Sequence, residues 1–327
     1  MVDTLDEMTA QVRGSWQRFL DVFEPLRPDL YRYCRHLTRS AWDAEDLSQD
    51  AMARAFVTLG TLFGEVPNPR AWLFRVASNL WIDQKRRARL QADDSRADLE
   101  MASHVSPSAQ GLREAAGTLL VHLSPQERAA VVLKDVFDFS LDEVAEVLST
   151  SVGAIKAALH RGRGKVISPE ERESHGVKPA VLDEFCAAFN ARDLDRLTAL
   201  LLTTASVEIV GVVTEYGQDA PKHPSRGSFA GTMAPITYDE RGGVRPEFLQ
   251  GYRGGGPRCE GLVHRDVLLL LFWYDHDSGP AVRTIMTVQT EGDSIARIRN
   301  YFFSPDVIAD ICAELAVPYR TNGYRYW

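Results

Sequence analysis

The stretch from Ser140 to Val166 constrains the fold of this chain more than any other segment. Its first half repeats apolar residues at helical spacing, which predicts a helix with one buried face, made of Leu141, Val144, Ala145 and Leu148. Small hydroxyl residues follow at 149–151 and can cap the start of a second helix. That second helix would turn a basic face outward, and two short helices with a cationic second member predict a helix-turn-helix that reads a DNA major groove.

The same pattern also has a structural interpretation. Helix pairs with a basic second member occur in proteins that bind no DNA, and a run of charge is commonly a solvated face. The rest of the chain has to decide between the two interpretations.

The charges of the chain are segregated. The net charge of −8 over 327 residues is unusual for a DNA-binding protein. Basic residues nevertheless cluster at 85–89 and 156–165, whereas acidic residues cluster at 43–50. This separation predicts one face for DNA and another for an electropositive protein partner.

The cysteines and the apolar segments predict a soluble protein of a reducing cytoplasm, with no membrane association. Cys34, Cys186, Cys259 and Cys312 are far apart and form no CxxC pair, so we expect neither a metal site nor a disulfide framework. The acidic N-terminus has no signal-peptide pattern. The apolar run 267–274 is too short to span a bilayer and predicts a buried strand. We expect no cofactor.

Composition divides the chain into three blocks joined by polar linkers. We predict a helical domain over 12–90, a linker over 91–111, a second helical domain over 112–167, a linker over 168–177 and a third domain over 178–327. The third block predicts a helix over 181–202, strands over 205–213, 267–274, 281–290 and 294–303, and a closing helix over 306–315. Two all-α domains would therefore precede an α+β domain with helices on one face of a curved antiparallel sheet.

The segment from Arg70 to Arg89 is the second strong motif. Trp72, Arg75, Asn79, Asp83 and Arg86 recur at helical spacing and share one face. Aromatic rings stack on unpaired bases and arginines hold phosphates, so this mixture suits melted DNA better than rigid duplex. The alternative places Trp72 and Trp81 in the core and the arginines in solvent; for Trp81 we favour the core.

An acidic helix is expected upstream, over 43–56. Leu47, Ala51, Ala55 and Leu59 would pack inward at helical spacing. The outer side would then carry Asp46, Gln49, Asp50 and Arg54, available to a partner.

Together these motifs resemble an extracytoplasmic-function (ECF) RNA polymerase sigma factor over about the first half of the chain. DAEDLSQDAMARAF resembles the region 2 helix that docks on the polymerase clamp coiled coil, and WLFRVASNLWIDQKRR resembles the helix that melts and reads the minus-ten element. The segment LSPQERAAVVLKDVFDFSLDEVAEVLSTSVGAIKAALHRGRGKV resembles region 4, which reads the minus-thirty-five element.

The resemblance implies core RNA polymerase (clamp coiled coil and flap) and promoter DNA as partners. The residues implied to bind polymerase are Asp46, Gln49 and Asp50. Those implied to face the minus-ten strand are Trp72, Arg75, Asn79, Asp83, Arg86 and Arg87, with the loop 62–69 shaping a pocket for a flipped base. Those implied to meet minus-thirty-five DNA are Ser151, Val152, Lys156, His160 and Arg161.

This sequence departs from the family pattern at several positions. Ala154 and Ala157 stand where many members carry Thr and Ser, so these two positions lack the hydroxyl groups of those members. Gly162 and Gly164 would loosen the helix end by up to roughly 1 kcal/mol each.

The third block resembles a SnoaL-like domain through FNARDLDRLTALLLTTASVEIVG and DSIARIRNYFFSPDVIADICAEL, over about 178–317. The resemblance implies a regulatory domain that contacts the sigma domains and tunes polymerase activation, with an unidentified small ligand as a further expectation. Only Pro305 and Asp306 match the motif common in sigma factors that carry this domain.

No catalytic residues are expected in the third block. Candidate acid or base groups are His264, Asp266, Asp275 and His276, but the last two fall in a predicted hairpin turn, where we expect them to be exposed. The predicted function is a promoter-specificity subunit that is not an enzyme. The alternatives are a cyclase- or isomerase-like enzyme fused to a DNA-binding module, and a helix-turn-helix repressor that needs no polymerase.

Overall fold

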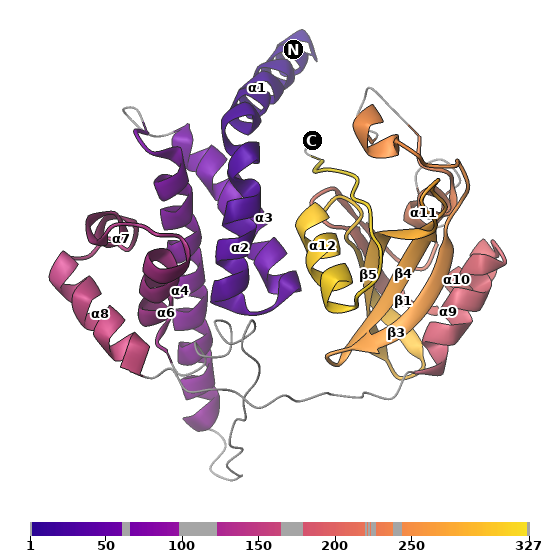
Figure 1. The fold of residues 1–327 in the computed structure, drawn as a ribbon. Helices are drawn as coiled ribbons and strands as arrows, with labels where there is room; N and C mark the ends of the chain where they lie inside the picture. The colour runs from indigo at the N-terminus through magenta and orange to yellow at the C-terminus, as the bar shows by residue number, and fades with distance from the viewer. Residues whose placement is uncertain are drawn as a thin grey trace. The chain divides into compact units, whose positions relative to one another are not determined.

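A computed structural model describes residues 2–60, 66–97, 123–164, 179–219, 221, 223, 227–237 and 244–325 (Figure 1). The chain forms two compact units, Met1–Arg172 and Glu173–Trp327. The first unit is helical where it is described, and the second combines helices with one sheet, so the predicted fold class is confirmed. Within the described residues, no helix combines the length and the apolar character needed to cross a membrane.

Four helices form the first half of the helical unit: α1 (Val2–Phe23), α2 (Arg27–Thr38), α3 (Ala41–Leu59) and α4 (Pro69–Ala97). A left-handed residue, Arg39, ends α2, and Ser40 then caps α3 by accepting a hydrogen bond from the Asp43 amide at 3.2 Å. The predicted inward residues Leu47, Ala51 and Ala55 are buried, and Trp81 is only 2% exposed, as predicted.

Helix α4 continues to Ala97, so the first residues of the linker predicted over 91–111 are helical. The segment QADDSRA over 91–97 is polar but holds neither Gly nor Pro. Polarity alone does not end a helix when the residues still favour helical backbone.

The second half of this unit contains α6 (Pro125–Val131), a π-helix (Val132–Val136), α7 (Leu141–Val147) and α8 (Val152–Gly164). Reciprocal capping boxes start α6 and α7, through Ser124 with Glu127 and Ser140 with Glu143. The Ser151 hydroxyl accepts a hydrogen bond from the Ala154 amide at 3.2 Å and starts α8. The predicted helix-turn-helix is confirmed as α7 and α8.

Gly162 has a packing role that the sequence-based prediction missed. A Cβ atom at this position would lie 2.9 Å from Cγ2 of Val131 and within 4 Å of Leu123. The glycine therefore lets α8 approach α6 closely, so it is a requirement of the fold rather than a loose helix end.

We expect Gly162→Ala to lower the free energy of unfolding by about 1–3 kcal/mol, because the added methyl group overpacks the contact between α6 and α8. Gly153→Ala is the matched control, since only Ser151 Oγ, at 3.9 Å, would lie near its Cβ on the same helix. Chemical denaturation of both variants checks the prediction. Equal stability of the two variants would contradict it.

The second unit begins with α9 (Ala180–Asn190) and α10 (Leu194–Ala199). Its strands are β1 (Leu201–Ile209), β2 (Val213–Tyr216), β3 (Arg258–His264), β4 (Val267–Tyr274), β5 (Ala281–Glu291) and β6 (Ser294–Asn300). The remaining helices are α11 (Ser228–Met233), a 3-10 turn (Pro246–Leu249) and α12 (Pro305–Glu314). The strands form one sheet in the order β2-β1-β6-β5-β4-β3.

Three predictions for this unit are corrected. The predicted helix over 181–202 breaks, because Arg192 adopts a left-handed backbone and Asp193 caps a new helix through the Arg196 amide at 2.9 Å. The strand predicted from residue 205 begins at Leu201. The sheet is mixed, since β1 pairs in parallel with β6 while the other neighbouring strands are antiparallel.

Both faces of the sheet are covered, whereas one covered face was predicted. Leu269, Leu270, Leu271 and Phe272 are consecutive in β4 and almost fully buried, which requires cover on both sides because successive side chains alternate. Helices α9 and α12 lie on opposite sides of the sheet in Figure 1. The core on the α9 side contains Leu182, Phe185, Phe189 and Leu197.

Candidate nucleic-acid interface

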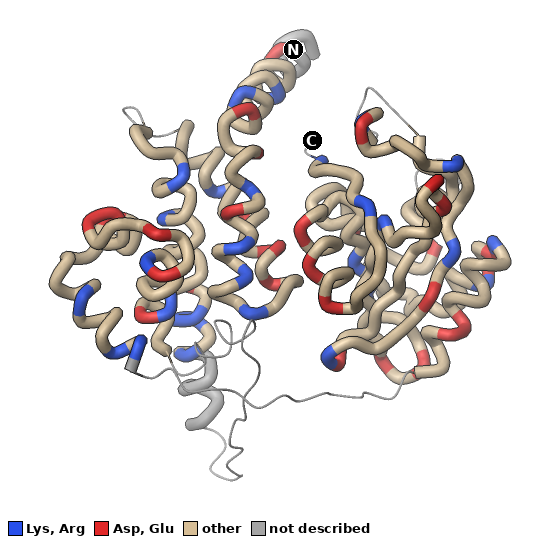
Figure 2. Tube along the Cα trace, in the orientation of Figure 1, with Lys and Arg blue, Asp and Glu red and all other residues tan. Residues whose placement is uncertain are grey.

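Helix α8 presents the basic face that its sequence predicts. Ile155 and Leu159 are buried, and Lys156, His160 and Arg161 are exposed. The other two predicted contacts lie at the start of the helix, where Ser151 is exposed and Val152 is half-buried. Figure 2 shows acidic positions on α7 and basic positions on α8.

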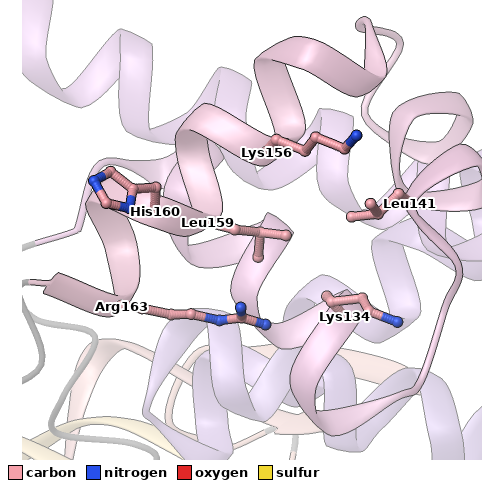
Figure 3. A pocket seen from close by; sticks show the side chains of 6 residues that line it. All are labelled: Lys134, Leu141, Lys156, Leu159, His160 and Arg163. Carbon is pink, nitrogen blue, oxygen red and sulfur yellow. The ribbon is translucent and has the colours of Figure 1, made fainter.

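An open hollow of about 580 Å³ adjoins this face (Figure 3). Its lining residues come from the π-helix, α7 and α8, and they are Lys134, Leu141, Lys156, Leu159, His160 and Arg163. The hollow combines two leucines with basic side chains. This combination suits a nucleic-acid backbone, whose sugars would pack against the apolar side chains and whose phosphates would contact the basic ones.

The arginines at the end of α8 have carboxylate partners inside the protein. Arg161 Nε lies 2.8 Å from Glu127 Oε1, and Glu127 also accepts the Ser124 amide in the capping box of α6. Arg163 pairs with Asp135 of the π-helix. Arg161 therefore ties α8 to α6 in addition to its predicted place on the DNA-facing surface.

Helix α4 carries the predicted minus-ten residues in two different environments. Asn79 and Arg87 are exposed, and Arg86 pairs with Asp83 one turn earlier at 3.1 Å. Trp72 is half-buried, with its ring centroid 5.7 Å from that of Phe23. Within the loop predicted over 62–69, residues 62–65 lie outside the described residues.

Arg75, predicted to face DNA, instead contacts the helix-turn-helix. Its Nη2 lies 2.5 Å from Glu146 Oε1 on α7. The Arg75 side chain is 31% exposed and that of Glu146 is 68% exposed. This pair uses one donor nitrogen of Arg75 and partly neutralises its charge, which weakens its attraction for a phosphate.

The acidic face of α3 is the predicted polymerase-binding surface. Asp50 is exposed, and Asp46 and Gln49 are half-buried. Partial burial raises the pKa of the Asp50 carboxyl above its ordinary value, and repulsion from Asp46 raises it further. The Gln49 amide donates a hydrogen bond to Glu45 Oε1 at 2.8 Å, which orients that part of the face.

Glu45 is a supporting residue that the sequence-based prediction missed. It is fully buried and forms an ion pair with Arg27 of α2. Its place beside Ala44 and three residues before Ser48, both buried, could have assigned it to the inward stripe. The buried pair joins α2 to α3 directly behind the acidic face.

A cluster of aromatic and arginine side chains joins the first four helices to the helix-turn-helix. The Arg70 guanidinium lies over the rings of Phe74 (5.2 Å), Phe137 (5.7 Å) and Phe139 (4.9 Å). Its Nε donates to Asp29 Oδ2 at 3.2 Å. We call this group, with Arg128 and Trp81, the aromatic junction.

Arg128 of α6 forms the other half of the aromatic junction. Its Nη1 donates to the Leu37 carbonyl at 2.7 Å, and its guanidinium lies 5.4 Å from the centroid of Trp81. Burial lowers the pKa of Arg128 to about 10, with a smaller contribution from Arg39, so the group stays protonated at neutral pH. The aromatic junction therefore packs α4 and α6 into one core.

The four candidate acid or base residues of the second unit lie in different environments. His264 Nε2 lies 2.7 Å from Glu314 Oε2 and ties β3 to α12. Asp266 and Asp275 are exposed. No group of three or more potential metal-ligating His, Cys, Asp and Glu side chains occurs in the described part of the chain.

The prediction that His276 is exposed is wrong, because it is only 3% exposed. Its Nδ1 lies 3.0 Å from the Tyr274 carbonyl, and its ring packs 5.8 Å from that of Tyr252. Burial lowers the pKa of His276, which favours a neutral ring. Residues 251–253 fold back on the turn after β4, through a bridge to His276, and cover it.

Comparisons with known proteins find relatives for both halves of the helical unit. Residues 22–91 match the sequence profile of Sigma-70 region 2, and residues 113–166 match that of Sigma-70 region 4. The ECF RNA polymerase sigma factor SigG of Mycobacterium tuberculosis is 30% identical over 57% of this chain, and the match spans only 60% of SigG. SigJ of the same species is 28% identical over 77% of this chain and 89% of SigJ.

A crystal structure of M. tuberculosis SigJ is 21% identical over 86% of this chain and 95% of that chain, with a TM-score of 0.32. The ECF sigma factor SigL of M. tuberculosis is 32% identical over 40% of this chain and 76% of SigL. The region 2 and region 4 profiles follow each other in the order that the sequence motifs predict. The chain therefore belongs to the family of ECF RNA polymerase sigma factors.

Proposed function

We propose that this protein binds core RNA polymerase and directs promoter-specific initiation of transcription. The observation that carries the proposal is the presence, in one chain, of a region 2 helix and a region 4 helix that both expose DNA-compatible side chains. Asn79 and Arg87 represent the first surface, and Lys156 and His160 the second.

Helix α4 would bind the melted minus-ten strand. Asn79 offers an amide to base edges, while Arg86 and Arg87 offer guanidinium groups to phosphates. Trp72 provides a ring for stacking at the other end of this face, and Asp83 orients Arg86. Arg75 would join them once it has left Glu146.

Helix α8 would bind the minus-thirty-five element in the major groove. Lys156 and His160 project from its exposed face, and the hollow beside them would receive the adjoining DNA backbone. Phosphate contacts give affinity without sequence information, and each good base contact adds about 1–3 kcal/mol of discrimination. A single short helix therefore binds weakly, and tethering through polymerase makes two weak surfaces sufficient.

Helix α3 would dock on polymerase through Asp46, Gln49 and Asp50. Their acidic character suits an electropositive partner such as the clamp coiled coil, and region 4 would contact the flap. Glu45 and Arg27 hold this face from behind, so α3 can act as a rigid docking element.

Promoter binding would require the aromatic junction to open. Elements about 25 base pairs apart, at about 3.4 Å per base pair, are separated by about 85 Å. A compact unit of this length has a radius of gyration of only about 16 Å. The packed α4 and α6 cannot reach both elements, so polymerase would have to separate them.

The second unit would tune this activity through contacts with the sigma domains, and an unidentified small ligand would be able to bias it. Removing residues 178–327 and measuring promoter output in a reconstituted assay tests this part; identical output would reject it. A multiple-turnover reaction that depends on His264 would instead support the enzyme alternative. Operator binding without polymerase would support a repressor.

Run-off transcription with purified core polymerase and a genomic promoter library tests the main proposal. We expect transcripts with the full chain, and at least a tenfold loss of polymerase capture for Asp46→Ala combined with Asp50→Ala, because both remove charge from the docking face. Asp142→Ala, an exposed acidic residue on α7, is the control and should behave as the unaltered protein. Failure of polymerase to bind or start synthesis with the unaltered chain would reject the proposal.

Replacing Lys156 with Ala should weaken binding of the polymerase complex to promoter fragments and lower the salt slope of log affinity by about 1. The reason is that the Lys156 ammonium would neutralise one backbone phosphate. Arg13→Ala, at an exposed position of α1, removes an equal charge outside the proposed surface. Measuring the promoter affinity of both variants over a range of salt concentrations tests this prediction. Equal slopes of log affinity for the two variants would show that Lys156 contacts no phosphate.

Glu146→Gln should raise promoter-complex formation by about 1.5- to 5-fold, because it frees Arg75 and removes one contact that keeps the two modules packed. The size is modest since both side chains of the pair reach solvent. Asp142→Asn, on the same helix, is the charge-matched control. If the two variants form complexes at the same rate, the Arg75–Glu146 pair does not restrain the free protein.

A further inference from the structure

Two cysteines far apart in the sequence lie side by side in the second unit. Sγ of Cys186 on α9 is 3.6 Å from Sγ of Cys259 on β3. Cys259 is 3% exposed, whereas Cys186 is partly exposed. Cys34 lies in α2 and Cys312 in α12, on other elements.

The packing of α9 on β3 fixes the backbone around this thiol pair. The Asn190 side chain accepts the Cys259 amide at 2.7 Å and donates to the Cys259 carbonyl at 2.9 Å. A Cβ on Gly261 would lie 3.2 Å from Cys186 Sγ, so the missing side chain leaves the space that the thiol occupies. Helix and strand are thus held in register at this point.

We infer that Cys186 and Cys259 are a site of reversible oxidation that forms a disulfide within the second unit. The sulfur atoms are in van der Waals contact and need to approach by only about 1.5 Å to reach the S–S bond length of about 2.05 Å. Small rotations of two side chains supply such a movement without a change in the backbone register.

A peroxide is the oxidant that suits the difference in exposure. The thiolate of Cys186 attacks one peroxide oxygen, the O–O bond breaks, and a sulfenic acid and water (or an alcohol) result. The Cys259 thiolate then attacks the Cys186 sulfur, the S–O bond breaks, and hydroxide leaves and takes up the Cys259 proton as water. Two thiols lose two electrons and two protons overall, and the peroxide accepts them.

The disulfide would link α9, the first described helix of the second unit, covalently to β3, an edge strand of its sheet. β3 is the last strand in the sheet order, and α9 is the first described helix after the helix-turn-helix. The crosslink joins residues 73 positions apart, so it restricts the unfolded chain over a long loop. Oxidation should therefore raise the melting temperature of this unit by about 5–15 °C, and a reductant should reverse the rise.

Peptide mapping of the full-length protein tests the inference. After treatment with hydrogen peroxide and alkylation, thiol counting in denaturant should fall from four to two. Tryptic digestion should then yield one crosslinked species that joins residues 173–192 to residues 259–265, and dithiothreitol should release both peptides. Four remaining thiols, a crosslink to another cysteine, or sulfinic acid at Cys186 would each overturn the inference.

Single variants give the matched controls. Cys186→Ser and Cys259→Ser should each abolish the crosslink and the reversible rise in melting temperature, with melting in reductant confirming that both variants fold. Cys312→Ser should retain both effects, because Cys312 lies on α12 and burial raises the pKa of its thiol to about 12. The outcome is independent of transcription, so it does not depend on the proposed function.

Discussion

The guanidinium of Arg70 lies at the centre of the contacts that hold the helical unit together. It lies over three phenyl rings and reaches Asp29 of α2, so one cation contacts both halves of the unit. Cation–π contacts contribute about 0.5–2 kcal/mol each, and aromatic pairs such as Phe74 with Phe137 add about 0.5–1.5 kcal/mol. The sum is a few kcal/mol, which keeps the free protein packed. It is also small beside the roughly 12 kcal/mol of a nanomolar protein complex.

The side chains proposed to bind DNA differ in how accessible they are in the packed unit. Lys156 and His160 are exposed on α8, and Asn79 and Arg87 are exposed on α4. Arg75, in contrast, is bound by Glu146 in the packed unit. On the proposed function, part of the free energy of polymerase binding would separate α4 from the helix-turn-helix. Arg75 would then be able to join the other residues proposed to bind the minus-ten strand. On the proposed function, the surfaces that read DNA would be partly accessible in the free protein and partly closed by the Arg75–Glu146 pair.

Local patterns in the sequence predicted the elements whose causes are local. The capped turn at Ser151 and the apolar spacing of α7 and α8 predicted the helix-turn-helix, and the strand Val267–Tyr274 was predicted with its observed bounds. Long-range contacts were not predictable in this way. Nothing near Arg70 in the sequence points to Phe137, and the burial of His276 depends on residues 251–253 folding back on its turn. The parallel pairing of β1 with β6 likewise joins segments that are more than ninety residues apart.

The positions predicted to face DNA came from helical spacing and from resemblance, and the structure adds their exposure and their partners. Periodicity could separate exposed from buried faces, as it did for Trp81, but it could not show that Arg75 has a carboxylate opposite it. Gly162 shows the same limit, because its role depends on Val131 of another helix.

The residues of helix α4 fall into two sets, one buried in the core and one exposed on the surface. Ala71, Phe74, Ala77 and Trp81 fill the core, while Asn79, Arg86 and Arg87 are exposed and Arg86 pairs with Asp83 of the same helix. Substitutions at the second set cost little folding free energy, because surface changes of this kind usually stay within about 0.5 kcal/mol. If α4 binds promoter DNA as proposed, its exposed side chains can change with little loss of folding free energy, so one scaffold would be able to address different promoters.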